Sequence, residues 1–204
     1  MFVFAHMDDE TILSYGTMAK LVSMGSDVMV LCMCGNGRLA TVSQIERFSA
    51  FKSNMENLGV RYATFNNTDL SLTRSAATPV ASEMALFRPE LVVTHFKSDL
   101  HFEHRLVYES VFLSCRTGSV KTLLTTTSSA TTYINGETFR PNFFIDITES
   151  VSAKKSALEM YSMELPADEL DPRSPSSVVL WNRLWGRTSH VAAAEPYELV
   201  FDRG

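Results

Sequence analysis

The sequence predicts a single α/β domain over residues 1–204, with a mostly parallel β-sheet. Short apolar runs of strand length alternate with longer stretches of helical apolar periodicity. A chain of 204 residues, 45% hydrophobic and 20% charged, is long enough to bury one core and has an ordinary globular composition. The one Pro/Asp/Ser-rich stretch, 166–175, is short and is interpreted as an exposed loop rather than a domain linker.

The first half of the chain alternates strand and helix in a regular order. Gly25 and Gly59 end the first two helices, and Ser43 with Glu46 resembles a capping box that opens the second. This alternation predicts right-handed crossovers with helices on both faces of the sheet, which is a Rossmann-like three-layer arrangement. The predicted elements are strand 2–5, helix 11–24, strand 27–34, helix 43–58, strand 61–65, helix 79–87, strand 90–95 and helix 103–115.

The last third of the chain is less regular. β-branched and threonine-rich runs predict several further strands, and Asn135-Gly136 is typical of a hairpin turn. The predicted elements are strands 120–127, 131–134, 138–140 and 142–147, helices 150–161 and 178–190, and a final strand.

A histidine and acidic residues follow the first predicted strand in the run Ala5-His6-Met7-Asp8-Asp9-Glu10. Neutral imidazole and carboxylate oxygen suit Zn²⁺ and similar divalent ions. Open α/β sheets also bind their ligands outside the carboxyl ends of the strands. A structural alternative exists, because carboxylates at a helix N-terminus cap free N–H groups and complement the helix dipole. In that interpretation His6 is only a turn residue.

A second cluster, Asp99-Leu100-His101-Phe102-Glu103-His104-Arg105, follows the predicted strand 90–95. A parallel sheet would bring the ends of these two strands together. Two surface histidines at a helix start would explain this cluster alone, but not both clusters. The pair therefore favours a shared metal site.

The two clusters resemble a known family. Ala5-His6-Met7-Asp8-Asp9-Glu10 resembles the Ala-His-Pro-Asp-Asp-Glu signature of the LmbE-like (PIG-L) family of zinc-dependent de-N-acetylases. Asp99-x-His101-x-Glu103-His104-Arg105 resembles the second motif of that family, usually His-Pro-Asp-His-Arg. Strand 89–95, the run 144–148 and the helix with Lys154, Lys155 and Tyr161 extend the likeness over most of the chain.

The resemblance implies a metal site with three protein ligands, His6, Asp9 and His104. A fourth position would stay open, as a catalytic rather than structural zinc requires. Zn²⁺ is the expected ion, and Fe²⁺ is the alternative.

The resemblance also implies catalytic roles. Asp8 would be the general base that takes a proton from the attacking water. His101, as a positively charged imidazole, would face the developing oxyanion or the leaving amine. Asp99 and Glu103 would orient and charge the histidines. No other cofactor is needed.

Two departures from the family pattern stand in these motifs. Met7 replaces the usual Pro, which loosens the turn without removing a ligand. Phe102-Glu103 replaces the usual Pro-Asp, and the extra methylene of Glu changes the reach of its carboxylate by about 1 Å or more.

The implied function is removal of acetyl from an N-acetylglucosamine-type sugar conjugate by metal-activated water. This substrate class rests on the resemblance alone, since fold and metal site do not fix the acyl group or aglycone. One alternative is a non-catalytic sugar- or nucleotide-binding domain of the same fold, against which the intact residue set argues. Another is a metal-dependent phosphoesterase, because clustered carboxylates can hold two ions. The single strong three-ligand set favours one ion.

Composition bears on partners and location. A net charge of −5 argues against nucleic acid or an anionic membrane as a partner, and no apolar run approaches the roughly 20 residues of a membrane span. Because the first predicted strand starts at Phe2, we expect no signal peptide, and we expect the three cysteines to form no disulfide framework. We therefore expect a cytoplasmic protein, and the sequence leaves a homo-oligomer open.

Other candidate residues receive structural interpretations. Cys32 and Cys34 are expected to pack on one face of their strand rather than form a second metal site. His95 is expected to be a structural histidine, and Glu195 a core residue rather than a catalytic one. Arg38 is equally compatible with substrate contact and with a solvated loop.

Overall fold

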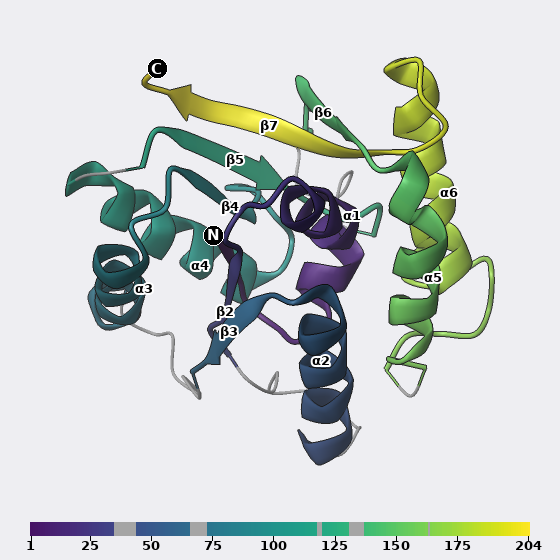
Figure 1. Cartoon of the computed structure of the whole chain (residues 1–204), viewed down its shortest axis with the longest axis horizontal. Coiled ribbons are helices and arrows are strands. Elements are labelled where there is room, and N and C mark those ends of the chain that lie inside the picture. The colour runs from purple at the N-terminus through teal and green to yellow at the C-terminus, as the bar shows by residue number, and fades with distance from the viewer. Residues whose placement is uncertain (35–43, 66–72, 118–119, 131–136, 163) are drawn as a thin grey trace.

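A computed structural model of the chain contains a seven-stranded sheet between layers of helices (Figure 1). It describes residues 1–34, 44–65, 73–117, 120–130, 137–162 and 164–204. The strands are β1 (Phe2–Phe4), β2 (Met29–Cys32), β3 (Arg61–Thr64), β4 (Leu91–His95), β5 (Thr122–Thr126), β6 (Phe143–Asp146) and β7 (Ala194–Asp202). The α-helices are α1 (Asp9–Ser23), α2 (Gln44–Leu58), α3 (Thr73–Phe87), α4 (Phe102–Ser114), α5 (Val151–Glu159) and α6 (Pro175–Thr188).

The strand order places β1 and β4 side by side at the centre of the sheet. The order is β3-β2-β1-β4-β5-β7-β6, with parallel pairing from β3 to β5 and antiparallel pairing of β7 with both neighbours. The chain builds outward from β1 to β3 and then returns to β4 on the other side of β1. This reversal creates a topological switch point, where open α/β sheets bind their ligands.

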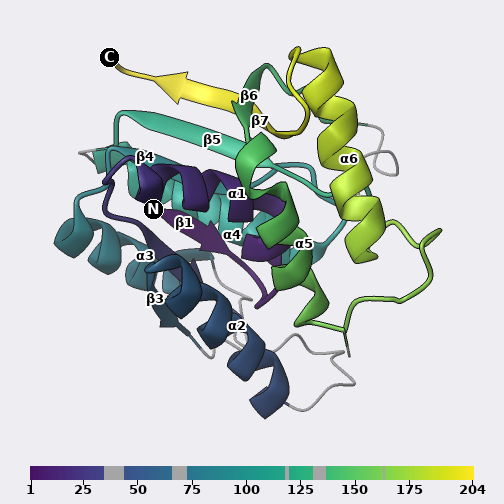
Figure 2. The same cartoon turned by 45° about the vertical axis from the view of Figure 1, so that its right-hand side comes forward.

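Two apolar clusters hold the helices on opposite faces of the sheet. Phe2 and Phe4 of β1 face one cluster, which includes side chains of α1, α2 and α5. Val3 faces the other cluster, with side chains of α3 and α4. The period-2 alternation of a strand thus gives β1 apolar packing on both sides. Figure 2 shows α1 crossing in front of β1, with α5 beside it.

The C-terminal part of the fold is fastened to α1 by a fully buried ion pair. Lys154 Nζ of α5 lies 2.7 Å from Glu195 Oε1 of β7. Glu195 also accepts hydrogen bonds from the backbone N–H groups of Gly16 and Thr17 at 2.9 and 2.8 Å. This agrees with the expected core role of Glu195.

Most predicted elements are present, with shifted ends. The helix predicted over 79–87 begins at Thr73, so Pro79 lies inside it and not at its start. The polar residues ahead of Pro79 carry little apolar periodicity, which hid the first turns. Residues 138–140 form no strand, because Arg140 N–H donates to the side chain of Glu198 rather than to a sheet partner. The predicted strand 131–134 and its Asn135-Gly136 turn lie outside the described residues.

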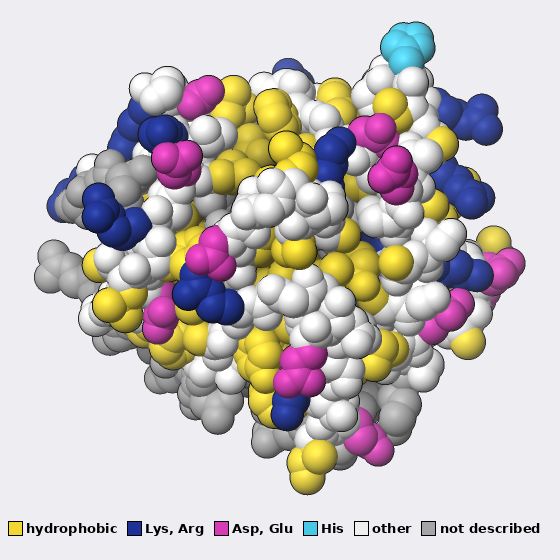
Figure 3. Space-filling view, in the orientation of Figure 1, with side chains coloured by type: hydrophobic (Ala, Val, Ile, Leu, Met, Phe, Trp, Pro, Cys, Tyr) yellow, Lys and Arg dark blue, Asp and Glu magenta, His cyan; other side chains and the backbone are white. Residues whose placement is uncertain are grey.

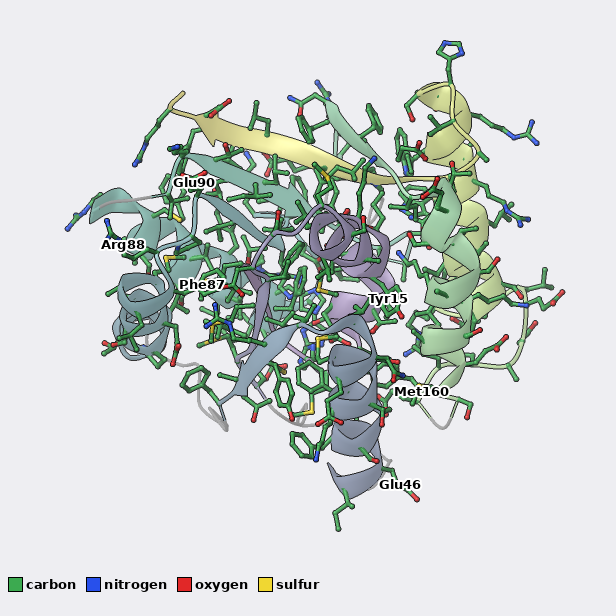
Figure 4. All side chains as sticks on the ribbon, viewed as in Figure 1. Tyr15, Glu46, Phe87, Arg88, Glu90 and Met160 are labelled. Atoms are coloured by element: carbon green, nitrogen blue, oxygen red, sulfur yellow. The ribbon has the colours of Figure 1, made fainter. Side chains whose placement is uncertain are left out.

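The connection from α3 to β4 runs through Arg88, which has a left-handed φ of 53°. Figure 4 labels Phe87, Arg88 and Glu90 at this turn, and Glu46 at the exposed first turn of α2. On the face seen in Figure 3, acidic and basic side chains are interspersed among apolar ones. No helix in the described part of the chain has the length and apolarity to cross a membrane.

Candidate metal centre and active site

The turn between β1 and α1 places His6 and Asp9 together. His6 lies two residues beyond the end of β1, and its backbone N–H donates to Asp9 Oδ2 at 2.8 Å. The same oxygen lies 3.3 Å from His6 Nδ1. Asp9 is the first residue of α1, where a carboxylate complements the helix dipole. Local chain geometry therefore aims both side chains at one point.

His104 of α4 completes a triangle with these two residues. Its Nε2 lies 3.3 Å from His6 Nδ1 and 3.4 Å from Asp9 Oδ2. Bond lengths of about 2.0–2.2 Å place neighbouring ligand atoms of a tetrahedral zinc ion roughly 3.3–3.5 Å apart. Three atoms with edges of 3.3, 3.3 and 3.4 Å therefore fit one divalent ion in size and in chemistry.

Two carboxylates hold the histidines by their other ring nitrogens. Glu103 Oε2 lies 2.7 Å from His6 Nε2, and Asp99 Oδ1 lies 3.2 Å from His104 Nδ1. Asp99 is itself fixed, because Thr127 Oγ1 donates to its Oδ2 at 2.8 Å. Carboxylates in these positions set the orientation of an imidazole and raise its basicity as a ligand.

His95 is the third imidazole near Asp9, and its surroundings favour a structural role. It is fully buried, stacks on His104 with ring centroids 3.8 Å apart, and accepts the Ala5 backbone N–H at Nε2. Burial lowers the pKa of His95 to about 4. Asp9, His95 and His104 also have ligand atoms within 4.8 Å of one another. The triangle with His6 is the better candidate site, because His95 Nε2 already accepts a hydrogen bond.

Asp8 lies beside this triangle in a buried ion pair. Arg47 of α2 places its Nη2 2.9 Å from Asp8 Oδ2, and its Nε donates to the carbonyl of Met7. Burial raises the pKa of Asp8 to about 6, although the charge of Arg47 opposes the shift. A carboxyl group with such a pKa changes protonation near neutral pH, as a general base must.

Glu10, the last acid of the first motif, supports the backbone of Asp8. It is fully buried, and its Oε2 accepts the Asp8 N–H at 3.0 Å. Its Oε1 accepts from Thr11 Oγ1 at 2.7 Å and from the Tyr161 hydroxyl at 2.8 Å. Tyr161, from the C-terminal half of the chain, thus helps fix the turn that carries the candidate base.

The neighbouring carboxylates raise the pKa values of the two candidate histidine ligands. Burial disfavours their charged forms, but hydrogen bonds with Asp9 and Glu103 outweigh it and raise the pKa of His6 to about 9. The pKa of His104 rises to about 10 against the same burial, because of Asp9 and Asp99. Without an ion, both imidazoles hold a proton at neutral pH that an ion would displace.

His101 lies at the entrance to the cluster, as the residue that precedes α4. Its ring centroid is 4.8 Å from that of His6 and 4.7 Å from that of His104, and its side chain is half exposed. Partial burial and the positive charge of His104 lower the pKa of His101. These surroundings favour a neutral imidazole rather than the charged one predicted from the sequence.

Sequence reasoning missed two residues at the site. Arg47 lies within a predicted helix, and no local signal pairs it with Asp8. The second missed residue is Cys34, because its ligand atom and those of His6 and Glu103 lie within 4.8 Å of one another.

Cys32 and Cys34 were predicted to lie on one face of their strand. They belong to different apolar clusters, since β2 ends at Cys32 and the strand alternation does not extend to Cys34. Arg38 lies outside the described residues.

Comparison with sequence families agrees with this geometry. Residues 1–114, which contain both clusters, match the PIG-L family, described as GlcNAc-PI de-N-acetylase. The chain belongs to the PIG-L family. This membership confirms the resemblance predicted from the two motifs. It also agrees with a metal-dependent hydrolase type of site.

Solved structures share the fold of this PIG-L chain. The conserved protein TT1542 from Thermus thermophilus has a TM-score of 0.80 and 18% identity, covering 98% of this chain and 94% of that one. The N,N'-diacetylchitobiose deacetylase from Pyrococcus horikoshii has a TM-score of 0.75 and 20% identity, covering 98% of this chain and 82% of that one. GalB, the 4-carboxy-2-hydroxymuconate hydratase from Pseudomonas putida KT2440, has a TM-score of 0.78 and 17% identity, covering 100% of this chain and 96% of that one. At these identities the likeness establishes a shared fold.

Proposed function

We propose that this chain is a zinc-dependent hydrolase that removes acetyl from an N-acetylglucosamine-type sugar conjugate. The observation that carries the proposal is the near-equilateral triangle of His6 Nδ1, Asp9 Oδ2 and His104 Nε2. Membership of a family described as a GlcNAc-PI de-N-acetylase supports the reaction. Structural neighbours named as deacetylases of N,N'-diacetylchitobiose and teicoplanin support it further.

His6, Asp9 and His104 would hold the ion in this proposal. Two imidazoles and one carboxylate suit zinc, and the same set suits Fe²⁺, which stays the alternative. One neighbour is described as a zinc-inhibited form of teicoplanin deacetylase Orf2, which supports an affinity of the fold for zinc. A bound divalent ion supplies Lewis-acid chemistry that polarises a carbonyl and makes water a better nucleophile.

Asp8 would act as the general base and accept a proton from the attacking water. Its pKa of about 6 keeps it largely ionised at neutral pH yet able to hold that proton. Arg47 holds one carboxylate oxygen and the Met7 carbonyl, which orients Asp8. His101 would donate a hydrogen bond from its neutral ring to the developing oxyanion or the leaving amine. Asp99 and Glu103 would hold the two histidine ligands.

The test separates metal binding from chemistry in two variants. Asp8→Asn keeps the size of the side chain and should leave the zinc content at about one ion per chain, while turnover falls roughly 10²–10⁴-fold. His104→Ala should lose the ion itself. Metal content is measured by elemental analysis, and turnover by release of free amine from N,N'-diacetylchitobiose and other N-acetylglucosamine conjugates. Equal metal loss in both variants would contradict the proposed role of Asp8 as the general base.

The alternatives predict different outcomes in the same assay. A metal-dependent phosphoesterase would cleave a phosphomonoester and release no free amine from an N-acetyl sugar. A non-catalytic binding domain would bind an N-acetyl sugar without releasing amine. The hydratase GalB shares the fold, so amine release rather than fold is the deciding measurement.

We further propose a cytoplasmic location and a small-molecule N-acetyl sugar conjugate as a partner. Three free, buried cysteines support a reducing compartment. The sequence leaves the formation of a homo-oligomer open.

A further inference from the structure

We propose that Cys34, Glu103 and His6 form a second, inhibitory site for a thiophilic divalent cation beside the metal triangle. This inference rests on the proposed function, since it describes how the same centre would be inhibited by excess zinc. The second ion would take Cys34 Sγ, Glu103 Oε2 and His6 Nε2 as ligands. His6 would then join the two ions through its two ring nitrogens.

The structure places the three ligand types together, and the hydrogen-bonded atoms of His6 and Glu103 would move apart by less than about 1 Å to admit an ion. The ligand atoms of Cys34, His6 and Glu103 lie within 4.8 Å of one another. His6 Nε2 and Glu103 Oε2 are already 2.7 Å apart, on the side of the ring away from the triangle. Cys34 is 4% exposed, so its thiol is sheltered from bulk solvent while it faces the two ligands.

The donor set favours a soft cation. Thiolate and imidazole bind zinc and other thiophilic ions, whereas magnesium and calcium prefer oxygen. Burial raises the pKa of the Cys34 thiol, and so do the nearby carboxylates of Glu103 and Asp9. The thiol is therefore protonated without an ion, but a coordinating cation deprotonates a thiol outright.

Carboxylates and deprotonated ligands nearly compensate the charge of two ions. Asp9, Asp99, Glu103, the Cys34 thiolate and the bridging His6 imidazolate would supply five negative charges, against the four positive charges of two divalent cations. Binding of the second ion releases one proton from the thiol and one from His6 Nε2, where Glu103 held it. These carboxylates make a second cation less costly than in a neutral pocket.

The second ion would inhibit through His6 and His101. The second ion would replace the hydrogen bond between Glu103 and His6 Nε2. The His6 imidazole would then be a ligand of both ions, which would change the strength with which it binds the first ion. His101 Nδ1 lies 3.9 Å from Glu103 Oε2, so the added positive charge would stand next to the residue proposed to donate at the reaction centre.

Cobalt titration of the metal-free chain tests the site without an activity assay. Co²⁺ bound by nitrogen and oxygen shows only weak visible bands, whereas Co²⁺ bound by thiolate adds an intense near-ultraviolet charge-transfer band. We expect the first equivalent to give no charge-transfer band and the second equivalent to give one. Wild-type protein that binds one equivalent, or binds two without this band, would overturn the proposal.

Two cysteine variants assign the band. Cys34→Ser, with Cys34→Ala as a second variant, should lose the band and bind one equivalent. Cys115→Ser is the matched control, because Cys115 is equally buried but lies at the far end of α4, about 18 Å from Glu103 along the helix axis. A band that survives in both Cys34 variants, or disappears in Cys115→Ser, would overturn the assignment. Circular dichroism verifies that each variant is folded.

Zinc dependence then separates this inference from the proposed function. In the wild type, the rate of amine release with excess zinc, divided by the rate with one equivalent, should fall well below one. In Cys34→Ser this ratio should stay near one. A low ratio in both proteins would overturn the inhibitory role of Cys34 while leaving the deacetylase proposal intact. No amine release by wild type at any zinc level would instead contradict the proposed function, and the cobalt result would still stand.

Discussion

Glu103 Oε2 lies 2.7 Å from Nε2 of His6, so a carboxylate in the first turn of α4 orients the imidazole that follows β1. The two residues are 97 positions apart in the chain. They meet because β1 and β4 are neighbours in the sheet and because both side chains follow the carboxyl ends of their strands. The longer side chain of Glu, compared with the usual Asp of the family motif, reaches His6 directly.

Replacement of Glu103 should weaken metal binding. Glu103→Gln removes the negative charge that fixes His6, and loss of such an orienting carboxylate lowers metal affinity by about 10–100-fold. Competition with a chromophoric chelator measures this affinity. Glu109→Gln, a change on the same helix away from the metal triangle, is the control and should bind zinc like the wild type. Equal affinities in both variants would show that Glu103 does not act through His6.

Removal of the Arg47 charge should move the acidic limb of the pH–rate profile. Arg47 lowers the pKa of Asp8 against the effect of burial. In Arg47→Met the pKa of Asp8 should therefore rise, and the acidic limb of kcat/KM should shift upward by roughly 1–2 pH units. Arg47→Lys keeps the charge and should retain most of the wild-type profile. An unshifted acidic limb in Arg47→Met would show that this limb does not report the ionisation of Asp8.

Ion-free protein should lose stability as pH rises from 6.5 to about 10. The pKa values of His6 and His104 are raised from 6.5 to about 9 and about 10. The folded state therefore binds protons that the unfolded state releases, and this stabilisation is complete below 6.5 and lost as pH passes the folded values. Because the folded state holds nearly two more protons than the unfolded state, the free energy of unfolding should fall by about 2 kcal/mol between about pH 8 and 9.

Urea unfolding with a chelator present measures this loss. With saturating zinc the ion takes the place of the titrating proton on His6 and on His104, so the decline should disappear or reverse. The same decline with and without zinc would mean that His6 and His104 are not the residues responsible.

Breaking the buried pair of Lys154 and Glu195 should destabilise the fold. Lys154→Met leaves Glu195 charged and fully buried, which costs about 3–5 kcal/mol. The double variant Lys154→Met with Glu195→Gln removes both charges and should recover part of the loss. Lys155→Met, at an exposed neighbouring position, is the control for thermal and urea unfolding. A loss no larger than in this control would show that the pair contributes little to stability.

Several features of the fold could be predicted from local sequence. The order of strands and helices as far as α4 follows from apolar periodicity and glycine stops, which are properties of short segments. The resemblance of the two motifs to the PIG-L family implied His6, Asp9 and His104 as ligands, and the structure brings their ligand atoms together. Errors fall where local signals are weak, as in the first turns of α3 and in residues 138–140.

The sequence by itself determined the fold class, the family and the two residue clusters of the candidate site. Only the tertiary structure decided which distant side chains meet: Arg47 with Asp8, Tyr161 with Glu10, Lys154 with Glu195, and Cys34 with Glu103 and His6. The shifted pKa values, such as the lowered pKa of His101, follow from contacts between distant side chains and from burial. The physical reason is that periodicity and capping act within a few residues, whereas contacts and desolvation depend on packing between elements that are far apart in the chain.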